Sequence, residues 1–277
     1  MTSQATLNAP IAFDGIGLHT GVACAVEVRP AAVDSGLTFF LSGNVRVAAV
    51  AENVIATSLA TVVGSGTTTV STVEHLLSAL FGMGVSNADI HVSGPEIPVT
   101  DGSAKTFADA IDTVGLVDQG APRATLTLAE PFSLRSGDRA LIALPADRFR
   151  VRFLADFPAP IGAQYFDGEI VPSLYRDEIC AARTFAYLRD VEGMRARGLA
   201  QGGSLENALV FDEAGPMQPT RWKNEVVRHK VLDLLGDFAL LGAWPQFDVL
   251  AIKSGHHLHC EAARALRARS APISRGT

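Results

Sequence analysis

The strongest constraint on the fold is a pattern that occurs twice along the chain. Residues 73–94 and 227–255 each read as an amphipathic helix with a histidine in its first turns, a glycine-containing turn, an apolar strand and a final Ser-Gly. A second helical stretch follows each copy, over 105–115 and 260–269. The pattern favours one α+β unit built twice, and the alternative is a chance likeness between two amphipathic helices.

Short alternating strands precede each copy of the pattern. They are expected over 22–30 and 37–41 in the first half, and over 124–128, 139–145 and 149–157 in the second. Strands followed by helices, given twice, predict two similar α+β domains. We place the first at residues 1–119 and the second at 120–277, with the join in the Gly/Pro/polar stretch 115–123.

Composition narrows the class of protein. Hydrophobic residues make up 48% and charged residues 19% of the 277 positions, which is typical of a folded domain and excludes disorder. The net charge, 23 − 29 = −6, and the lack of a basic run argue against nucleic acid as a partner. Three cysteines without a C-x-x-C pair, no secretory signal and no apolar run of membrane length predict a cytoplasmic protein without stable membrane insertion.

The two histidines of the repeat are expected to face away from their own cores. At 100° per residue, His75 lies opposite the apolar face of its helix and in line with Gly82. His229 and Asp233 lie opposite the apolar face of the second helix, in line with Gly236. If the halves meet through these faces, the small residues allow close approach and the polar groups converge in an interdomain cleft.

This convergence has the make-up of a catalytic metal site. His229 and Asp233 are spaced i, i+4, so one imidazole and one carboxylate project from the same side of a helix, and His75 supplies a third ligand. Two histidines and one carboxylate with an open position suit catalytic zinc, and ferrous iron takes the same donors. The alternative is a solvated helix face, because H-x-x-x-D alone is a weak pattern.

Two carboxylates near these ligands have a functional and a structural interpretation. Glu74, beside His75, can take a proton from an attacking water, whereas Ser71 to Glu74 also reads as a helix capping box. Asp237, one turn beyond Asp233, can accept a hydrogen bond from another imidazole or stand as a surface acid.

The segment 254–260 carries three of the seven histidines. His256 follows Gly255 and is expected in a loop at a strand end, where its ring can act as a general acid. The cluster also suits metal ligands or a polar turn. Lys230 can attract a phosphate or remain solvated.

Three glycine-containing loops, 15–21, 94–103 and 201–210, are expected as turns. The first is not a dinucleotide fingerprint, because no helix pattern follows it.

Taken together, six segments resemble one family. They are GIGLHTG, STVEHLLSAL, EIPVTDGSA, ARTFAYLRDVEGMRARGLAQGGSLENALV, NEVVRHKVLDLLGD and KSGHHLH. In this order and spacing they are similar to the zinc-dependent UDP-3-O-acyl-N-acetylglucosamine deacetylases of lipid A biosynthesis, over residues 6 to 270. The resemblance implies helices sandwiched between two mostly antiparallel sheets, with the site at the domain interface. It also implies an acylated UDP-amino sugar as the small-molecule substrate.

The resemblance also implies a role for each site residue. His75, His229 and Asp233 become zinc ligands, Glu74 the general base, and His256 the acid or electrophile oriented by Asp237. Thr184 would hydrogen-bond the reacting carbonyl oxygen and Lys230 would contact the nucleotide diphosphate. The residues that match the family's acyl-chain passage are Phe185, Leu188, Val191, Ala200, Gly203, Ser204, Leu205 and Val210.

Two departures keep other functions open. The family usually has Asn at the position of His259, and residues 217–223 (MQPTRWK) replace a common Gly-Leu-Arg-aromatic-acidic run. An added ring at 259 would alter nucleotide contacts or fill space. One alternative is therefore a paralogous deacetylase of another N-acetylated sugar nucleotide. Another is a non-catalytic sugar-nucleotide-binding homologue, against which the complete set of catalytic residue types argues.

Overall fold

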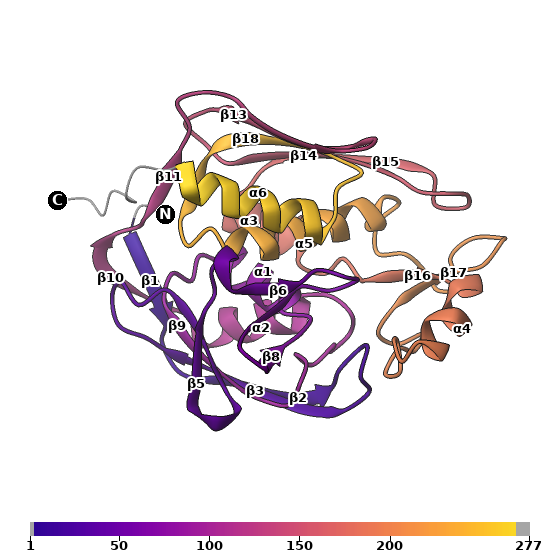
Figure 1. Ribbon diagram of the computed structural model, residues 1–277, viewed down its shortest axis with the longest axis horizontal. Coiled ribbons are helices and arrows are strands. Elements are labelled where there is room, and N and C mark those ends of the chain that lie inside the picture. The colour runs from indigo at the N-terminus through magenta and orange to yellow at the C-terminus, as the bar shows by residue number, and fades with distance from the viewer. Residues whose placement is uncertain (1–2, 270–277) are drawn as a thin grey trace.

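Two sheets of the same topology enclose a layer of helices in the computed structural model, which describes residues 3–269 (Figure 1). The first sheet has the order β2 (Ile11–Ile16), β3 (Ala23–Pro30), β9 (Ala88–Ser93), β4 (Leu37–Leu41) and β5 (Val45–Ala48). The second has the order β12 (Phe132–Ser136), β13 (Arg139–Pro145), β18 (Trp244–Ile252), β14 (Arg150–Asp156) and β15 (Ala163–Glu169).

The pairing directions show that the two sheets are copies of one design. In the first sheet β9 is antiparallel to β3 and parallel to β4, and both outer pairs are antiparallel. In the second, β18 is antiparallel to β13 and parallel to β14, and its outer pairs are again antiparallel. A short strand, β11 (Thr125–Thr127), adds to β18 in parallel. The internal repeat and the α+β class are thus confirmed.

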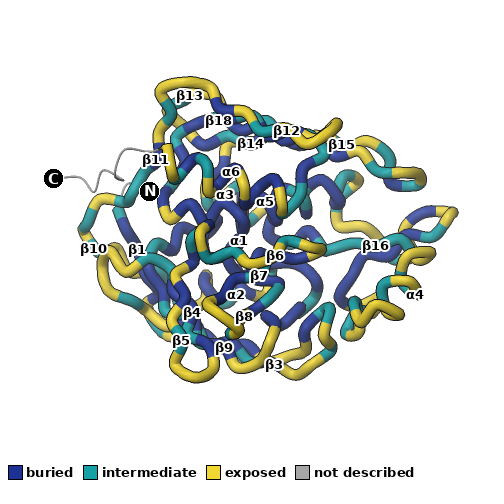
Figure 2. The backbone as a smooth tube through the Cα atoms, in the orientation of Figure 1, coloured by how far each residue is buried: buried dark blue, intermediate teal, exposed yellow. Residues whose placement is uncertain are grey.

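The helices occupy equivalent places in the two halves. Helix α1 (Glu74–Met83) precedes β9 and α2 (Lys105–Val114) follows it, as α5 (Glu225–Ala239) precedes β18 and α6 (His256–Arg269) follows it. Every residue of α1 is buried, because the helix packs against both α5 and α2. Figure 2 shows α1 and α5 at the buried centre of the molecule. Their polar faces therefore meet inside the protein instead of facing solvent.

The remaining elements lie at the edges. Small sheets form from β1 (Ser3–Leu7) with β10 (Leu116–Pro122), from β6 (Val54–Ala56), β7 (Val62–Ser65) and β8 (Thr68–Val70), and from β16 (Phe185–Tyr187) with β17 (Leu209–Phe211). The short helical segments are η1 (Ser42–Asn44), η2 (Ala51–Asn53), α3 (Pro172–Leu174), η3 (Tyr175–Ile179) and α4 (Leu188–Ala196). The segment with β16, α4 and β17 projects beyond the two sheets (Figure 1).

Two expectations from the sequence differ from the structure. The stretch 115–123, expected as a join, contains strand β10, whose backbone pairs antiparallel with β1 at the start of the chain. Helix α6 begins at His256, four residues before the expected position, so this histidine lies in the first turn of a helix and not in a loop. The domain limits stay a prediction, and residues 1–2 and 270–277 of those ranges lie outside the described residues. Among the described helices, none has the length and apolar character needed to cross a membrane.

Candidate active site

Two histidines and one aspartate converge where α1 meets α5. The Asp233 Oδ1 atom lies 3.7 Å from Nε2 of His75 and 3.4 Å from Nε2 of His229. The two imidazole rings stand edge to face, with centroids 5.1 Å apart. One donor atom from each of the three side chains lies within 4.8 Å of the other two, and all three residues are buried. The sequence-predicted ligand set is therefore brought together from the two halves.

The electrostatics of this trio suit a cation. Asp233 Oδ1 is buried and has no hydrogen-bond partner among the described residues, a costly state that a bound cation relieves. Burial lowers the pKa of His75 to about 3 and also lowers the pKa of His229, so both rings are neutral, as ligands must be. Burial opposes ionisation of Asp233, but the positive charges around it, among them Lys230 at 2.6 Å, hold its pKa well below the usual range.

The close approach of the two helices depends on Gly236. A Cβ atom at this position would lie 2.0 Å from the backbone oxygen of Glu74, at the start of α1. No side chain fits there, so the glycine allows α5 to lie against the first turn of α1. The expectation that small residues on the polar faces permit close packing is confirmed at Gly236, whereas a Cβ at Gly82 would meet the Tyr175 ring.

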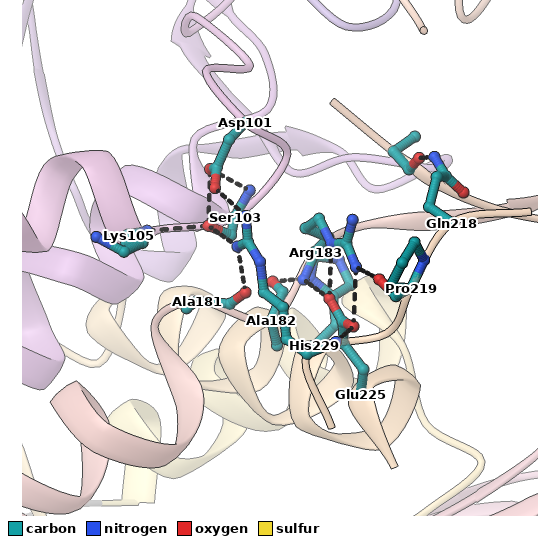
Figure 3. Close-up of polar contacts among 12 residues, drawn as sticks. Asp101, Ser103, Lys105, Ala181, Ala182, Arg183, Gln218, Pro219, Glu225 and His229 are labelled. Carbon is teal, nitrogen blue, oxygen red and sulfur yellow. Dashed lines mark hydrogen bonds and ion pairs between the residues drawn. The ribbon is translucent and has the colours of Figure 1, made fainter. Parts of the chain in front are cut away.

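The orientation of His229 is fixed from the other side of its ring. Nδ1 lies 3.1 Å from the backbone oxygen of Ala182, which leaves Nε2 directed toward Asp233. The next residue, Arg183, forms a largely buried ion pair with Glu225 in the first turn of α5, at 2.9 Å. Figure 3 shows this pair beside Ala182 and His229. The ion pair therefore anchors the backbone that positions the imidazole.

A second arginine ties the same backbone to the first half of the chain. Arg221 donates to Asp101 Oδ2 at 2.8 Å and to the Ala181 backbone oxygen at 2.6 Å, and its backbone N–H binds Glu225. Asp101 belongs to the turn-rich loop 94–103, and Figure 3 shows it above Ser103. The departure over 217–223 thus supplies a contact between the halves.

Glu74 faces the site and does not cap its helix. Its Oε2 accepts the backbone N–H of Thr61 at 3.0 Å, and no side-chain hydrogen bond caps the start of α1. The capping-box interpretation is wrong, because the backbone N–H that Glu74 accepts belongs to Thr61, the loop residue before β7, and not to Ser71. Burial raises the pKa of Glu74 to about 7, which suits a carboxylate that exchanges a proton near neutral pH.

His256 stands across from Glu74. Its Nδ1 lies 2.9 Å from Asp237 Oδ2, while its Nε2 lies 3.7 Å from Glu74 Oε1 and 3.8 Å from Asp233 Oδ2. Burial disfavours the charged ring, but Asp237, Glu74 and Asp233 together raise the pKa of His256 to about 9. The surface-acid alternative for Asp237 is wrong, since this carboxylate is fully buried. The site thus pairs a carboxylate with a protonated imidazole.

Thr184 and Lys230 border this arrangement. Thr184 lies between Ala182 and Phe185, whose ring contacts His229 at a centroid distance of 6.1 Å. Its backbone N–H donates to Gly102 at 2.7 Å. Lys230 Nζ lies 2.6 Å from Asp233 Oδ2, so the two oxygens of this carboxylate have different partners. Lys230 also lines a cavity of about 280 Å³ together with Arg139, Phe157 and Lys253.

The expected acyl-passage residues lie in the projecting segment. Phe185 is in β16 and Val210 in β17, two strands that pair in parallel. Leu188 and Val191 are in α4, and Ala200, Gly203, Ser204 and Leu205 are in the loop that returns to β17. The side chains of Leu188 and Leu205 are 47% and 49% exposed. The structure thus gathers these residues on one arm, where Leu188 and Leu205 are open to solvent and Val210 is buried.

The arm also touches the first half of the chain. The backbone N–H of Gly202 donates to Leu18 at 3.0 Å, and a Cβ at Gly202 would lie 2.2 Å from the Gly17 oxygen. The 15–21 loop is held in turn by Glu96, a buried carboxylate that accepts from the backbone of His19 and Thr20 and from the Thr20 and Thr72 hydroxyls. The three glycine-containing loops therefore form one connected rim beside the site.

Three contributors to the site were missed from the sequence. Thr61 binds Glu74 through its backbone and Asp237 through its hydroxyl at 2.6 Å, and no local pattern marks it. The Arg183–Glu225 pair joins positions far apart in sequence. In the sequence, only the charge of Arg183 and Glu225 marks these two residues.

Comparisons with known proteins agree with this geometry. The family model described as UDP-3-O-acyl N-acetylglycosamine deacetylase matches residues 4–268. Among similar proteins, one of the same description from Thermosynechococcus vestitus is 42% identical over 270 residues, which cover 96% of this chain and 94% of the relative. Another, from Phenylobacterium zucineum, is 43% identical over 274 residues, which cover 96% and 94%. The chain therefore belongs to the UDP-3-O-acyl-N-acetylglucosamine deacetylase family.

Proposed function

We propose that this protein is a metal-dependent amide hydrolase that removes the N-acetyl group of UDP-3-O-acyl-N-acetylglucosamine in lipid A biosynthesis, giving acetate and a free amine. The observation that carries the proposal is the buried, unpartnered Asp233 oxygen beside two neutral imidazoles, with Glu74 and His256 facing the same point. Family membership supplies the substrate.

His75, His229 and Asp233 are the residues that would hold the cation. Their donor set fits zinc, and ferrous iron accepts the same ligands. When bound, such a cation acts as a Lewis acid that polarises a carbonyl and lowers the pKa of water. The ring of His229 is held ready by Ala182, and Asp233 keeps Oδ1 available because Lys230 occupies Oδ2.

Glu74 and His256 would move the protons. Glu74 takes a proton from the water whose oxygen attacks the acetamide carbon. When the C–N bond breaks, His256 gives its Nε2 proton to the leaving nitrogen, so the amine departs as a neutral group. Asp237 holds the opposite ring nitrogen, which keeps Nε2 of His256 directed toward the site.

Thr184 and Lys230 would contact other parts of the substrate. The Thr184 hydroxyl would donate to the carbonyl oxygen as negative charge develops on it. Lys230 lies between the ligand trio and a cavity that Arg139 also lines, and these two cationic side chains would attract a diphosphate, whereas Lys253 of the same cavity is paired with Asp138 and Asp156. The acyl chain would cover the projecting arm, and burial of its exposed leucines would then lower the free energy of substrate binding. The expected passage residues on this arm are Phe185, Leu188, Val191, Ala200, Gly203, Ser204, Leu205 and Val210.

Acetate release from the acylated UDP-sugar tests the proposal. Glu74→Gln and His256→Ala should each lower turnover by about 10²–10³-fold while leaving metal content at one equivalent. His257→Ala is the matched control, because this neighbouring ring is 68% exposed and pairs only with Glu261 among the described residues. Nearly full activity in both site variants would contradict the proposed roles, and equal rates with and without the 3-O-acyl group would favour a paralogous substrate.

A further inference from the structure

His259 is a buried imidazole with a partner for each ring nitrogen. Its Nδ1 lies 2.9 Å from Asp237 Oδ2, and its Nε2 lies 2.8 Å from Ser254 Oγ. The residue has no exposed surface and its ring meets Phe153 edge to face. It stands three residues after His256 on α6, so both rings project toward α5 from the same turn of the helix. The ring therefore does more than fill space, one of the two outcomes expected from the sequence, and it does not line the cavity beside Lys230.

The hydrogen bonds fix which nitrogen of His259 carries the proton. An ionised carboxylate only accepts, so Nδ1 must donate to Asp237. In a neutral ring the other nitrogen is then an acceptor, and the Ser254 hydroxyl donates to it. This tautomer is the less common one for free histidine, so its presence would report the contact directly.

Asp237 consequently receives three hydrogen bonds inside the protein. His256 and His259 share Oδ2, each at 2.9 Å, and the Thr61 hydroxyl binds Oδ1 at 2.6 Å. The donors come from three directions: the 57–61 loop, and two positions of α6. Rotation of the carboxylate about its Cβ–Cγ bond would break at least one of them.

We infer that His259 is a positioning residue for the hydrolysis: it locks the Asp237 carboxylate in the one orientation that directs the His256 ring toward Glu74 and Asp233. The inference deepens the proposed function and rests on the role assigned there to His256. His259 does not touch substrate, and its effect passes entirely through Asp237.

The inference predicts which replacements preserve the role. Asparagine places an amide N–H close to the position of the histidine Nδ1, so it retains the donor to Asp237 and gives up Ser254. Glutamine reaches toward Ser254 and away from Asp237, and leucine offers no donor at all.

Nuclear magnetic resonance of the full chain, with ¹⁵N-labelled histidine and one equivalent of Zn²⁺, tests the contact without a variant. We expect the His259 resonances, assigned through their loss in His259→Asn, to show a protonated Nδ1 and a bare Nε2. A protonated Nε2 would overturn the inference. Because the tautomer is read without turnover, failure of the proposed function would leave this result standing, and the two failures are distinguishable.

Steady-state kinetics of the metal-loaded variants test the consequence. His259→Leu and His259→Gln should lower kcat by about 10–100-fold, the usual effect of removing a supporting hydrogen bond, with KM and metal content within about twofold. His259→Asn should stay within about threefold of the parent, and His257→Leu is the matched control on the same helix. If His259→Leu does not fold, the Asn and Gln pair gives the same comparison. Equal kcat for Asn and Gln, or a loss confined to KM or metal content, would overturn the inference.

Discussion

Replacing Gly236 with alanine should disable the site without removing any of its functional groups. The added methyl group would lie 2.0 Å from the Glu74 backbone oxygen, 2.7 Å from its carbonyl carbon and 2.9 Å from its Cα. Real Cβ contacts are essentially never shorter than 3.0 Å, so α5 and the first turn of α1 must move apart by about 1 Å or more at this point. The obstructing atoms are backbone, so no side-chain rotation relieves the clash.

That separation changes the distances within the site, because His75 and Glu74 lie on α1 while His229 and Asp233 lie on α5. A displacement of about 1 Å in a catalytic arrangement costs about 10²-fold in rate. Overpacking of this kind also destabilises a protein by about 1–3 kcal/mol. We therefore expect Gly236→Ala to lower kcat/KM at least about 100-fold and to weaken metal binding.

The assay combines acetate release, metal content after dialysis and urea unfolding. Gly193→Ala is the matched control, because Gly193 is also helical and a Cβ there meets nothing within 4 Å. That variant should keep metal and activity and gain up to about 1 kcal/mol of stability from the better helix former. A Gly236→Ala protein with full metal content and parental activity would refute the reasoning about the helix contact.

Three further predictions concern other parts of the site. The kcat/KM of the metal-loaded protein should rise with pH below about 7, because Glu74 must be ionised and a bound cation lowers its pKa from about 7. It should fall again at or below about pH 9, where His256 loses its proton, because the cation also lowers the pKa of this ring from about 9; a rate still rising above about pH 9 would contradict the assignment. Glu96→Ala should lower the free energy of unfolding in urea by at least about 2 kcal/mol, because it removes a buried carboxylate that accepts three hydrogen bonds from the 15–21 loop and one from buried Thr72. Exposed Glu213→Ala should change it by less than about 0.5 kcal/mol, and equal free energies of unfolding for the two variants would exclude the anchoring role. Leu205→Lys should raise KM for the acylated substrate about tenfold and leave KM for a substrate without the 3-O-acyl group unchanged, because burying a leucine against the acyl chain contributes about 1.5–3 kcal/mol to binding. Equal effects on both substrates would show that Leu205 does not belong to the acyl passage.

The repeat explains why much of the architecture follows from the sequence. Periodicity identified the helices that carry His75 and His229, and alternation identified β3, β4, β13 and β14 nearly to the residue. The spacing of His229 and Asp233 placed two ligands on one helix face. Only a second copy of the unit, packed through the same face, could supply the third, and the repeat indicated that copy.

Long-range contacts account for what the sequence did not indicate. Glu74 reads as a cap because the capping box is a local pattern, but Thr61 reaches the carboxylate from an adjacent loop. Strand β10 forms because β1, at the start of the chain, offers it a backbone partner. His259 reads as a polar turn until α6 packs on α5 and brings its ring to Asp237. In each case tertiary packing supplies the partner, and local sequence carries no record of it.

The central claim is that two imidazoles and one carboxylate, from both halves of the chain, hold one divalent cation. X-ray absorption at the zinc edge, on protein loaded with one equivalent of Zn²⁺, tests it most directly. We expect two imidazole nitrogens at about 2.0–2.1 Å and the remaining ligands to be oxygen at about 2.0–2.2 Å. A sulfur ligand at about 2.3 Å, or an imidazole contribution unchanged in His75→Ala, would contradict the account.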